Sequence, residues 1–120
     1  MASKGTIILS TFPTKESVVD VANKVVTNRL CACVNFSKIR SIYSWRGKME
    51  DQSEFIALFK TTAKSAKKLK AEIARLHPYE VPEIVELRMC DVSKSYLSWL
   101  VESTDGVAKK RNNSTKRRNA

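Results

Sequence analysis

The fold is decided by the stretch CVNFSKIRSIYSWRGKMEDQSEFIALFKTT, residues 33–62. Its first part, 33–45, alternates well enough between apolar and polar residues to predict a long strand, and 53–61 is the returning strand. Between them, Trp45-Arg46-Gly47-Lys48 has the composition of a tight turn, in which Gly47 can adopt a positive φ. Apolar residues stand on both faces of 53–61, so we expect that strand to be covered on both sides.

The flanking segments complete a repeated strand and helix pattern. They predict a buried strand over 5–12 and an amphipathic helix over 15–30 that is capped by Thr14. A second amphipathic helix over 63–76 is ended by His77-Pro78. A strand over 84–90 and a final helix that starts at Asp91 or Ser93 follow. The order is βαββαβ plus a C-terminal helix. This order predicts an α+β, ferredoxin-like fold with an antiparallel sheet and both main helices on one of its faces.

That arrangement leaves the other face of the sheet open. One small helix is too little to cover its apolar side chains, which are Ile39, Ile42, Tyr43, Trp45, Ile56 and Leu58. A patch of this kind usually marks an interface, so we expect self-association, with Trp45, Tyr43 and Ile56 as contact residues.

Charge divides the chain into two parts. The 120 residues carry 22 Lys or Arg and 12 Asp or Glu, a net charge of +10, and half of that excess falls on 105–120. We expect one domain over 1–104 and a disordered basic tail over 105–120, which binds nucleic acid at most nonspecifically.

No apolar run approaches the ~20 residues of a membrane span, and three cysteines form no disulfide framework. The composition therefore predicts a cytoplasmic protein with no membrane partner.

Few residues have the chemistry of a metal ligand. His77 is the single histidine and offers an imidazole to Cu²⁺ or Zn²⁺, although a structural hydrogen-bonding role is the alternative. Cys31 and Cys33 form a C-x-C that either holds a soft metal or packs as two small buried side chains. Cys90 is expected in the core.

Lys60 lies at the end of an apolar run and needs an anionic partner, for which Glu83 is a candidate. Such a pair either fixes the register of an interface or lines a site for a small anion. No GxSxG, P-loop or HExxH motif is present, so the sequence predicts no enzyme.

Three stretches together resemble the CutA family of divalent-cation-tolerance proteins. They are NRLCACVNFSKIRSIYSWRGKMEDQSEFIALFKTT, LHPYEVPEIVEL and SYLSWL, at 28–62, 76–87 and 95–100. The resemblance covers roughly residues 5–102. It implies a ferredoxin-like subunit, a homotrimer, binding of divalent metals, chiefly copper, and no established reaction. It also implies kinship with PII-type trimers, which bind ligands between subunits.

The resemblance also assigns roles to single residues. His77 matches one histidine of the family's HHPY form and Cys33 matches its RLAACVN cysteine, so these two are the candidate metal ligands. Leu76 and Ser10 stand where other members have further soft ligands, so we expect Cu²⁺ or another divalent cation to bind weakly. A cleft between subunits is implied for Lys60, Tyr79, Glu83 and Trp99. The sequence therefore predicts a homotrimeric metal-responsive protein; the alternative is a PII-like trimer or scaffold that binds a small anion.

Overall fold

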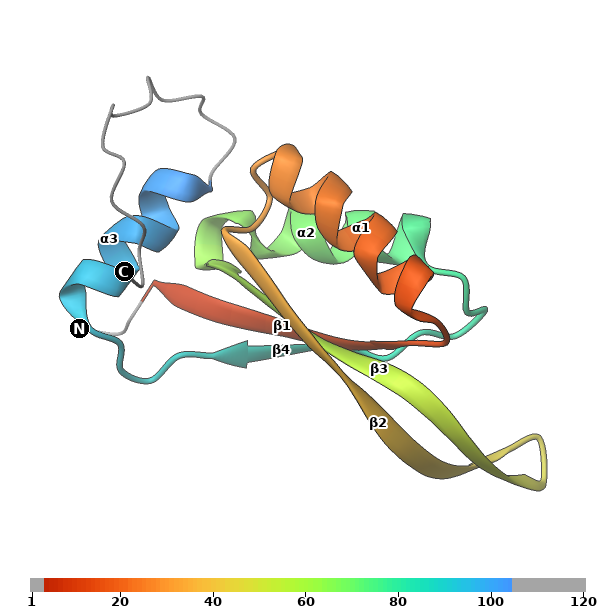
Figure 1. Cartoon of the computed structure of the whole chain (residues 1–120). Helices are drawn as coiled ribbons and strands as arrows, with labels where there is room; N and C mark the ends of the chain where they lie inside the picture. Colours follow the sequence, from red (N-terminus) through yellow and green to blue (C-terminus); the bar gives the residue numbers. More distant parts are fainter. Residues whose placement is uncertain (1–3, 105–120) are drawn as a thin grey trace.

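A computed structural model describes residues 4–104 as a four-stranded antiparallel sheet with two of its three helices packed on one face (Figure 1). The elements in chain order are β1 (Gly5–Phe12), α1 (Lys15–Thr27), β2 (Cys33–Trp45), β3 (Lys48–Thr62), α2 (Ala63–Leu76), β4 (Ile84–Arg88) and α3 (Lys94–Ser103). The strand order is β2-β3-β1-β4, which confirms the α+β, ferredoxin-like arrangement. The disorder predicted for 105–120 lies outside the described residues.

The core lies between the sheet and the pair α1 and α2. Each strand alternates its side chains between the two faces, so β1 sends Ile8 and Phe12 inward and β3 sends Ala57 and Phe59 inward, all fully buried. The helices supply the other buried apolar side chains, which are Val18, Val21, Val25, Ala66, Leu69 and Ile73. Thr14 caps α1 by accepting a hydrogen bond from the Ser17 amide, as its sequence position predicts.

The β2–β3 hairpin extends beyond the helices (Figure 1). Its strands pair without interruption from Cys33↔Lys60 to Trp45↔Lys48. Arg46 and Gly47 form the two-residue turn, with φ of 52° and 78°. Two positive φ angles match the right-handed twist of a hairpin, which confirms the predicted turn.

Four details of the sequence prediction were wrong. Helix α1 ends at Thr27 instead of residue 30, because Arg29 takes a left-handed φ of 61°. Strand β3 begins at Lys48 instead of residue 53, since the ladder of the hairpin continues through polar residues up to the turn. Strand β4 ends at Arg88, where its pairing with β1 ends, so Cys90 is exposed rather than in the core.

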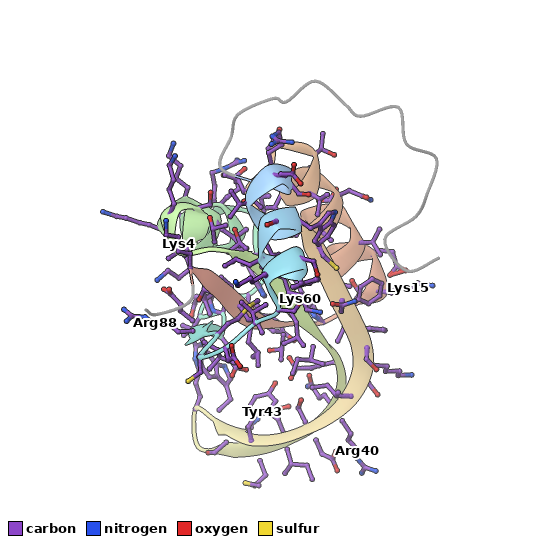
Figure 2. The ribbon with its side chains drawn as sticks, turned by 90° about the vertical axis from the view of Figure 1, so that its left-hand side faces the viewer. Lys4, Lys15, Arg40, Tyr43, Lys60 and Arg88 are labelled. Atoms are coloured by element: carbon purple, nitrogen blue, oxygen red, sulfur yellow. The ribbon has the colours of Figure 1, made fainter. Side chains whose placement is uncertain are left out.

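The face of the sheet opposite α1 and α2 is the open face. Large side chains there remain substantially exposed: Tyr43 by 37%, Trp45 by 41%, Val85 by 40% and Leu87 by 44%. Helix α3 covers only one end of this face, beside Lys60 (Figure 2). None of the helices within residues 4–104 is long and apolar enough to cross a membrane.

Candidate functional site: the hairpin groove

A groove of about 820 Å³ lies between the β2–β3 hairpin and the segment that joins α2 to β4; we call it the hairpin groove. Its walls come from 39–46, from Glu54 and Ile56 on β3, and from 78–83, with Leu9 and Thr11 at its base. The hairpin curves over the open face, so the groove is continuous with the exposed apolar surface described above. Of the residues predicted to matter, Tyr43, Trp45, Ile56, Tyr79 and Glu83 meet here.

Charge in the hairpin groove is predominantly negative. Its lining has the carboxylates of Glu54, Glu80 and Glu83 and a single cation, Arg46. That guanidinium pairs with Glu80 at 2.7 Å and lies 5.3 Å from the ring centroid of Trp45. Two carboxylates therefore remain without a cationic partner among the described residues. This lining favours a cation over an anion.

Glu54 and Tyr79 make the tightest contact of the site. Glu54 lies on β3 and is only 6% exposed, and the Tyr79 hydroxyl donates a hydrogen bond to its Oε2 at 2.5 Å. Burial, followed by the bond to Glu54, raises the pKa of Tyr79. The phenol therefore stays protonated at neutral pH and serves as a donor that satisfies a buried carboxylate.

His77 is held by both of its ring nitrogens. The Tyr79 backbone amide donates to Nδ1 at 3.1 Å, so Nδ1 carries no proton and Nε2–H donates to the Thr11 carbonyl oxygen at 2.9 Å. The ring also stacks on Phe12, with centroids 4.3 Å apart. Burial lowers the pKa of His77, opposed by the bond to Thr11 and the charge of Glu54. This is the structural alternative that the sequence left open, and a metal would have to displace one of these two bonds.

The two cysteines of the C-x-C have different surroundings. Cys31 is fully buried before β2 begins, and burial, together with the nearby Cys33 thiol, raises its pKa to about 12. It is therefore a protonated thiol at neutral pH, which is a poor metal ligand. Cys33 is half-buried at the start of β2, paired with Lys60 of β3.

Cys33 and His77 lie far apart within the subunit. Lys60, the neighbour of Cys33, pairs with Ile7, whereas the His77 ring bonds to Thr11, four residues farther along β1. A strand rises about 3.3 Å per residue, so these positions are separated by ~13 Å. Within residues 4–104, no three side chains of His, Cys, Asp and Glu gather as a metal site.

The predicted ligand cleft is also divided. Tyr79 and Glu83 line the hairpin groove, but Lys60 and Trp99 do not. Trp99 instead contacts Tyr96 within α3, with ring centroids 5.6 Å apart, and Lys60 forms no salt bridge with Glu83 among the described residues. The cleft was predicted between subunits, so groups that are separated within one subunit could still meet across an interface, and the cleft stays a prediction.

Sequence reasoning missed Glu54 as the centre of the site. Its signal was present, since Glu54 precedes Ile56 and Leu58 on the same strand face, where a carboxylate needs a partner. The partner, Tyr79, lies 25 residues farther along the chain, and only the folded chain identifies it.

Comparison with known proteins gives a consistent result across sequence and structure. The family profile described as "CutA1 divalent ion tolerance protein" matches residues 6–103. "Divalent-cation tolerance protein CutA" of Thermotoga maritima is 41% identical over 97 residues, covering 81% of this chain and 96% of that protein. The Thermus thermophilus protein of the same name is 41% identical over 99 residues, covering 82% and 96%.

Solved structures show the same architecture. The crystal structure of CutA1 from Pyrococcus horikoshii superposes with a TM-score of 0.81 at 39% identity, covering 83% of this chain and 98% of that one. CutA from Xylella fastidiosa superposes with a TM-score of 0.83 at 32% identity, covering 86% and 100%.

Proposed function

The chain belongs to the CutA1 family of divalent ion tolerance proteins, and from this premise we propose that it is a homotrimer that binds a divalent cation weakly in the hairpin groove. Copper is the first candidate, as the family resemblance implies. The observation that carries the proposal is the groove itself, in which exposed aromatic side chains adjoin two carboxylates without a cationic partner. We assign no reaction to the protein.

The open face supports the assembly. Tyr43, Trp45 and Leu87 are large apolar or aromatic side chains exposed on the open face, which costs free energy in water and is typical of an interface. The hairpin extends beyond its own core, so it is placed to contact a neighbour (Figure 1). Contacts between two different surfaces close into a ring when the rotation closes, and three subunits is the number that the family resemblance implies.

The carboxylates of the hairpin groove support the proposal of a cation site there. Glu54 and Glu83 both line the groove, Glu83 is exposed there, and carboxylate oxygens bind divalent ions. A single subunit supplies too few ligands for a tight site, so a complete shell needs groups from two subunits. Oxygen ligands without an available imidazole make a weak copper site, which agrees with the weak binding expected from Leu76 and Ser10.

Calorimetric titration of the full chain with Cu²⁺, Zn²⁺ and Mg²⁺ tests the proposal. Glu83→Gln is expected to weaken binding of the preferred ion by at least about tenfold. The matched control is Glu16→Gln, which removes an exposed carboxylate from the first turn of α1 and is expected to leave binding unchanged. His77→Gln is also expected to retain affinity, because its ring nitrogens are used within the subunit. Loss of binding in His77→Gln with unchanged binding in Glu83→Gln would assign the metal to the histidine instead.

A further inference from the structure

The net charge of the folded part is concentrated in one place. Residues 4–104 contain sixteen Lys or Arg and eleven Asp or Glu. One surface, which we call the α2 basic patch, holds six of the cations and the carboxylate of Glu86; the six are Lys4, Lys64, Lys67, Lys68, Lys70 and Arg88. Glu72, which also lies on α2, pairs with Arg75 and is counted with the remainder. The remaining ten cations and ten carboxylates balance. The whole excess of five positive charges therefore lies on this patch.

The α2 basic patch is assembled from three elements. The Lys4 carbonyl oxygen accepts a hydrogen bond from the Ala63 amide at 2.7 Å, which holds the start of α2 against the start of β1. Arg88 is the last residue of β4 and pairs with Thr6 of β1. Figure 2 shows Lys4 and Arg88 on the same side of the molecule, next to α2 seen nearly end-on.

Most of these cations form no salt bridge within the described part of the chain. Lys70 donates to Glu86 at 2.6 Å, and this pair uses the one carboxylate of the patch. The other five side chains are exposed and form no salt bridge with any carboxylate of residues 4–104. The first turn of α2 contains no acidic residue to offset Lys64. Arg88 is attracted to Glu86 across space, but none of the five forms a salt bridge among the described residues. Cations gathered on one surface repel each other, and a polyanion relieves that repulsion.

We propose that the α2 basic patch binds the phosphate backbone of duplex nucleic acid without reading its sequence. Lys64 to Lys70 extend over ~9 Å of helix axis, a length on which a duplex carries about five phosphate charges. None of the exposed large apolar side chains of the described residues lies on α2, and Val85 and Leu87 of β4 point to the opposite face. The patch thus has no aromatic ring to stack on unpaired bases and no apolar side chain to insert into a membrane, while ammonium groups suit phosphates.

The patch is separate from the hairpin groove and from the open face. It lies on the helix side of the sheet, so the proposed assembly leaves it outside the interface (Figures 1 and 2). A trimer would present three copies, which raises the avidity for a long polyanion.

The test compares three full-length variants of equal charge. The patch variant carries Lys64→Gln, Lys67→Gln and Lys68→Gln. The surface control carries Lys15→Gln, Lys38→Gln and Lys94→Gln, three exposed lysines on other elements, and the tail control carries Lys109→Gln, Lys110→Gln and Arg111→Gln. Each lowers the net charge by three, from +10 to +7. Affinity for a fluorescent DNA duplex is measured by anisotropy between ~50 and ~200 mM salt.

We expect the patch variant to bind at least about tenfold more weakly than either control at ~100 mM salt, with a salt slope reduced by about 0.9 for each lost phosphate contact. Equal losses in all three variants would show that net charge alone matters, and the largest loss in the tail control would assign binding to 105–120. If the unaltered chain binds vesicles of phosphatidylserine and phosphatidylcholine more tightly than the duplex, the ligand of the patch is an anionic membrane and not nucleic acid. Each of these results overturns the proposal.

Discussion

The Tyr79 hydroxyl donates a hydrogen bond to the buried carboxylate of Glu54, with 2.5 Å between Oη and Oε2, and so ties the segment after α2 to the middle of β3. Both residues line the hairpin groove, so this bond joins two of its walls. A hydrogen bond from a neutral phenol adds no positive charge to the groove, so Arg46 remains the single cation of its lining. The contact therefore serves both the stability of the fold and the electrostatic character of the groove.

Removal of that donor is expected to destabilise the protein. In Tyr79→Phe, the ring keeps its packing but Glu54 loses its phenol partner in a buried position, which costs ~1–3 kcal/mol of the free energy of unfolding. Tyr43→Phe is the comparison, because the Tyr43 side chain is 37% exposed and the charges of Glu54 and Glu50 act on its hydroxyl only across space, without a hydrogen bond to either. Guanidinium unfolding at fixed protein concentration measures both. Equal stabilities of the two variants would show that the Tyr79–Glu54 bond contributes nothing net.

His77 is expected to make stability depend on pH. Burial lowers its pKa in the folded state below the ordinary value of 6.5, so the unfolded chain binds the proton more tightly. The free energy of unfolding should therefore fall as the pH drops through about 6.5 toward the folded-state pKa, and stay level above that window. His77→Gln, which keeps an N–H donor for the Thr11 carbonyl, should remove this slope. The measurement is unfolding at a series of pH values between 5 and 8, and a slope that persists in the variant would assign the effect to another group.

Removal of the Ser10 hydroxyl is expected to stabilise the protein. This hydroxyl is fully buried on β1 with no hydrogen-bond partner among the described residues. Ser10→Ala removes that unsatisfied group at little cost in packing, so it should raise the free energy of unfolding by up to ~1 kcal/mol. The contrasting variant is Thr61→Val, because the Thr61 hydroxyl donates to the Leu30 carbonyl at 2.7 Å; it should lower stability by about 0.5–1.5 kcal/mol. Destabilisation by Ser10→Ala would mean that the hydroxyl has an ordered partner such as water.

Trp45 is expected to anchor the assembly. Light scattering of the full chain at micromolar concentration should give about three times its mass of 13.6 kDa. Trp45→Ala should weaken association by ~2 kcal/mol or more for each site, because large aromatic side chains at the centre of an interface carry much of its free energy. Val26→Ala is the control, since Val26 is exposed by 38% on α1, away from the open face. A monomer in the unaltered chain, or equal dissociation of both variants, would contradict the interface.

The pattern of elements was predictable because its signals are local. Strand alternation, helical periodicity, Thr14 at the start of α1 and Gly47 in the hairpin turn each act over a few residues, and the structure confirms the order and topology they predict. The errors fall where pairing overrides local composition. Residues 48–52, which are polar except for Met49, join β3 because the opposite strand supplies hydrogen-bond partners for their backbone.

The character of the candidate site was decided by the tertiary structure alone. The order of amino acids identifies the residues with suitable chemistry, namely His77, Cys33, Lys60, Tyr79 and Glu83. Folding determined which of them meet: it used both nitrogens of His77 in hydrogen bonds, placed Cys33 and Lys60 at the other end of the sheet, and joined Tyr79 to Glu54. The physical reason is that these contacts link positions far apart in sequence, whose distance is set by strand register and by the path of the loop after α2, and no local pattern of residues encodes that distance.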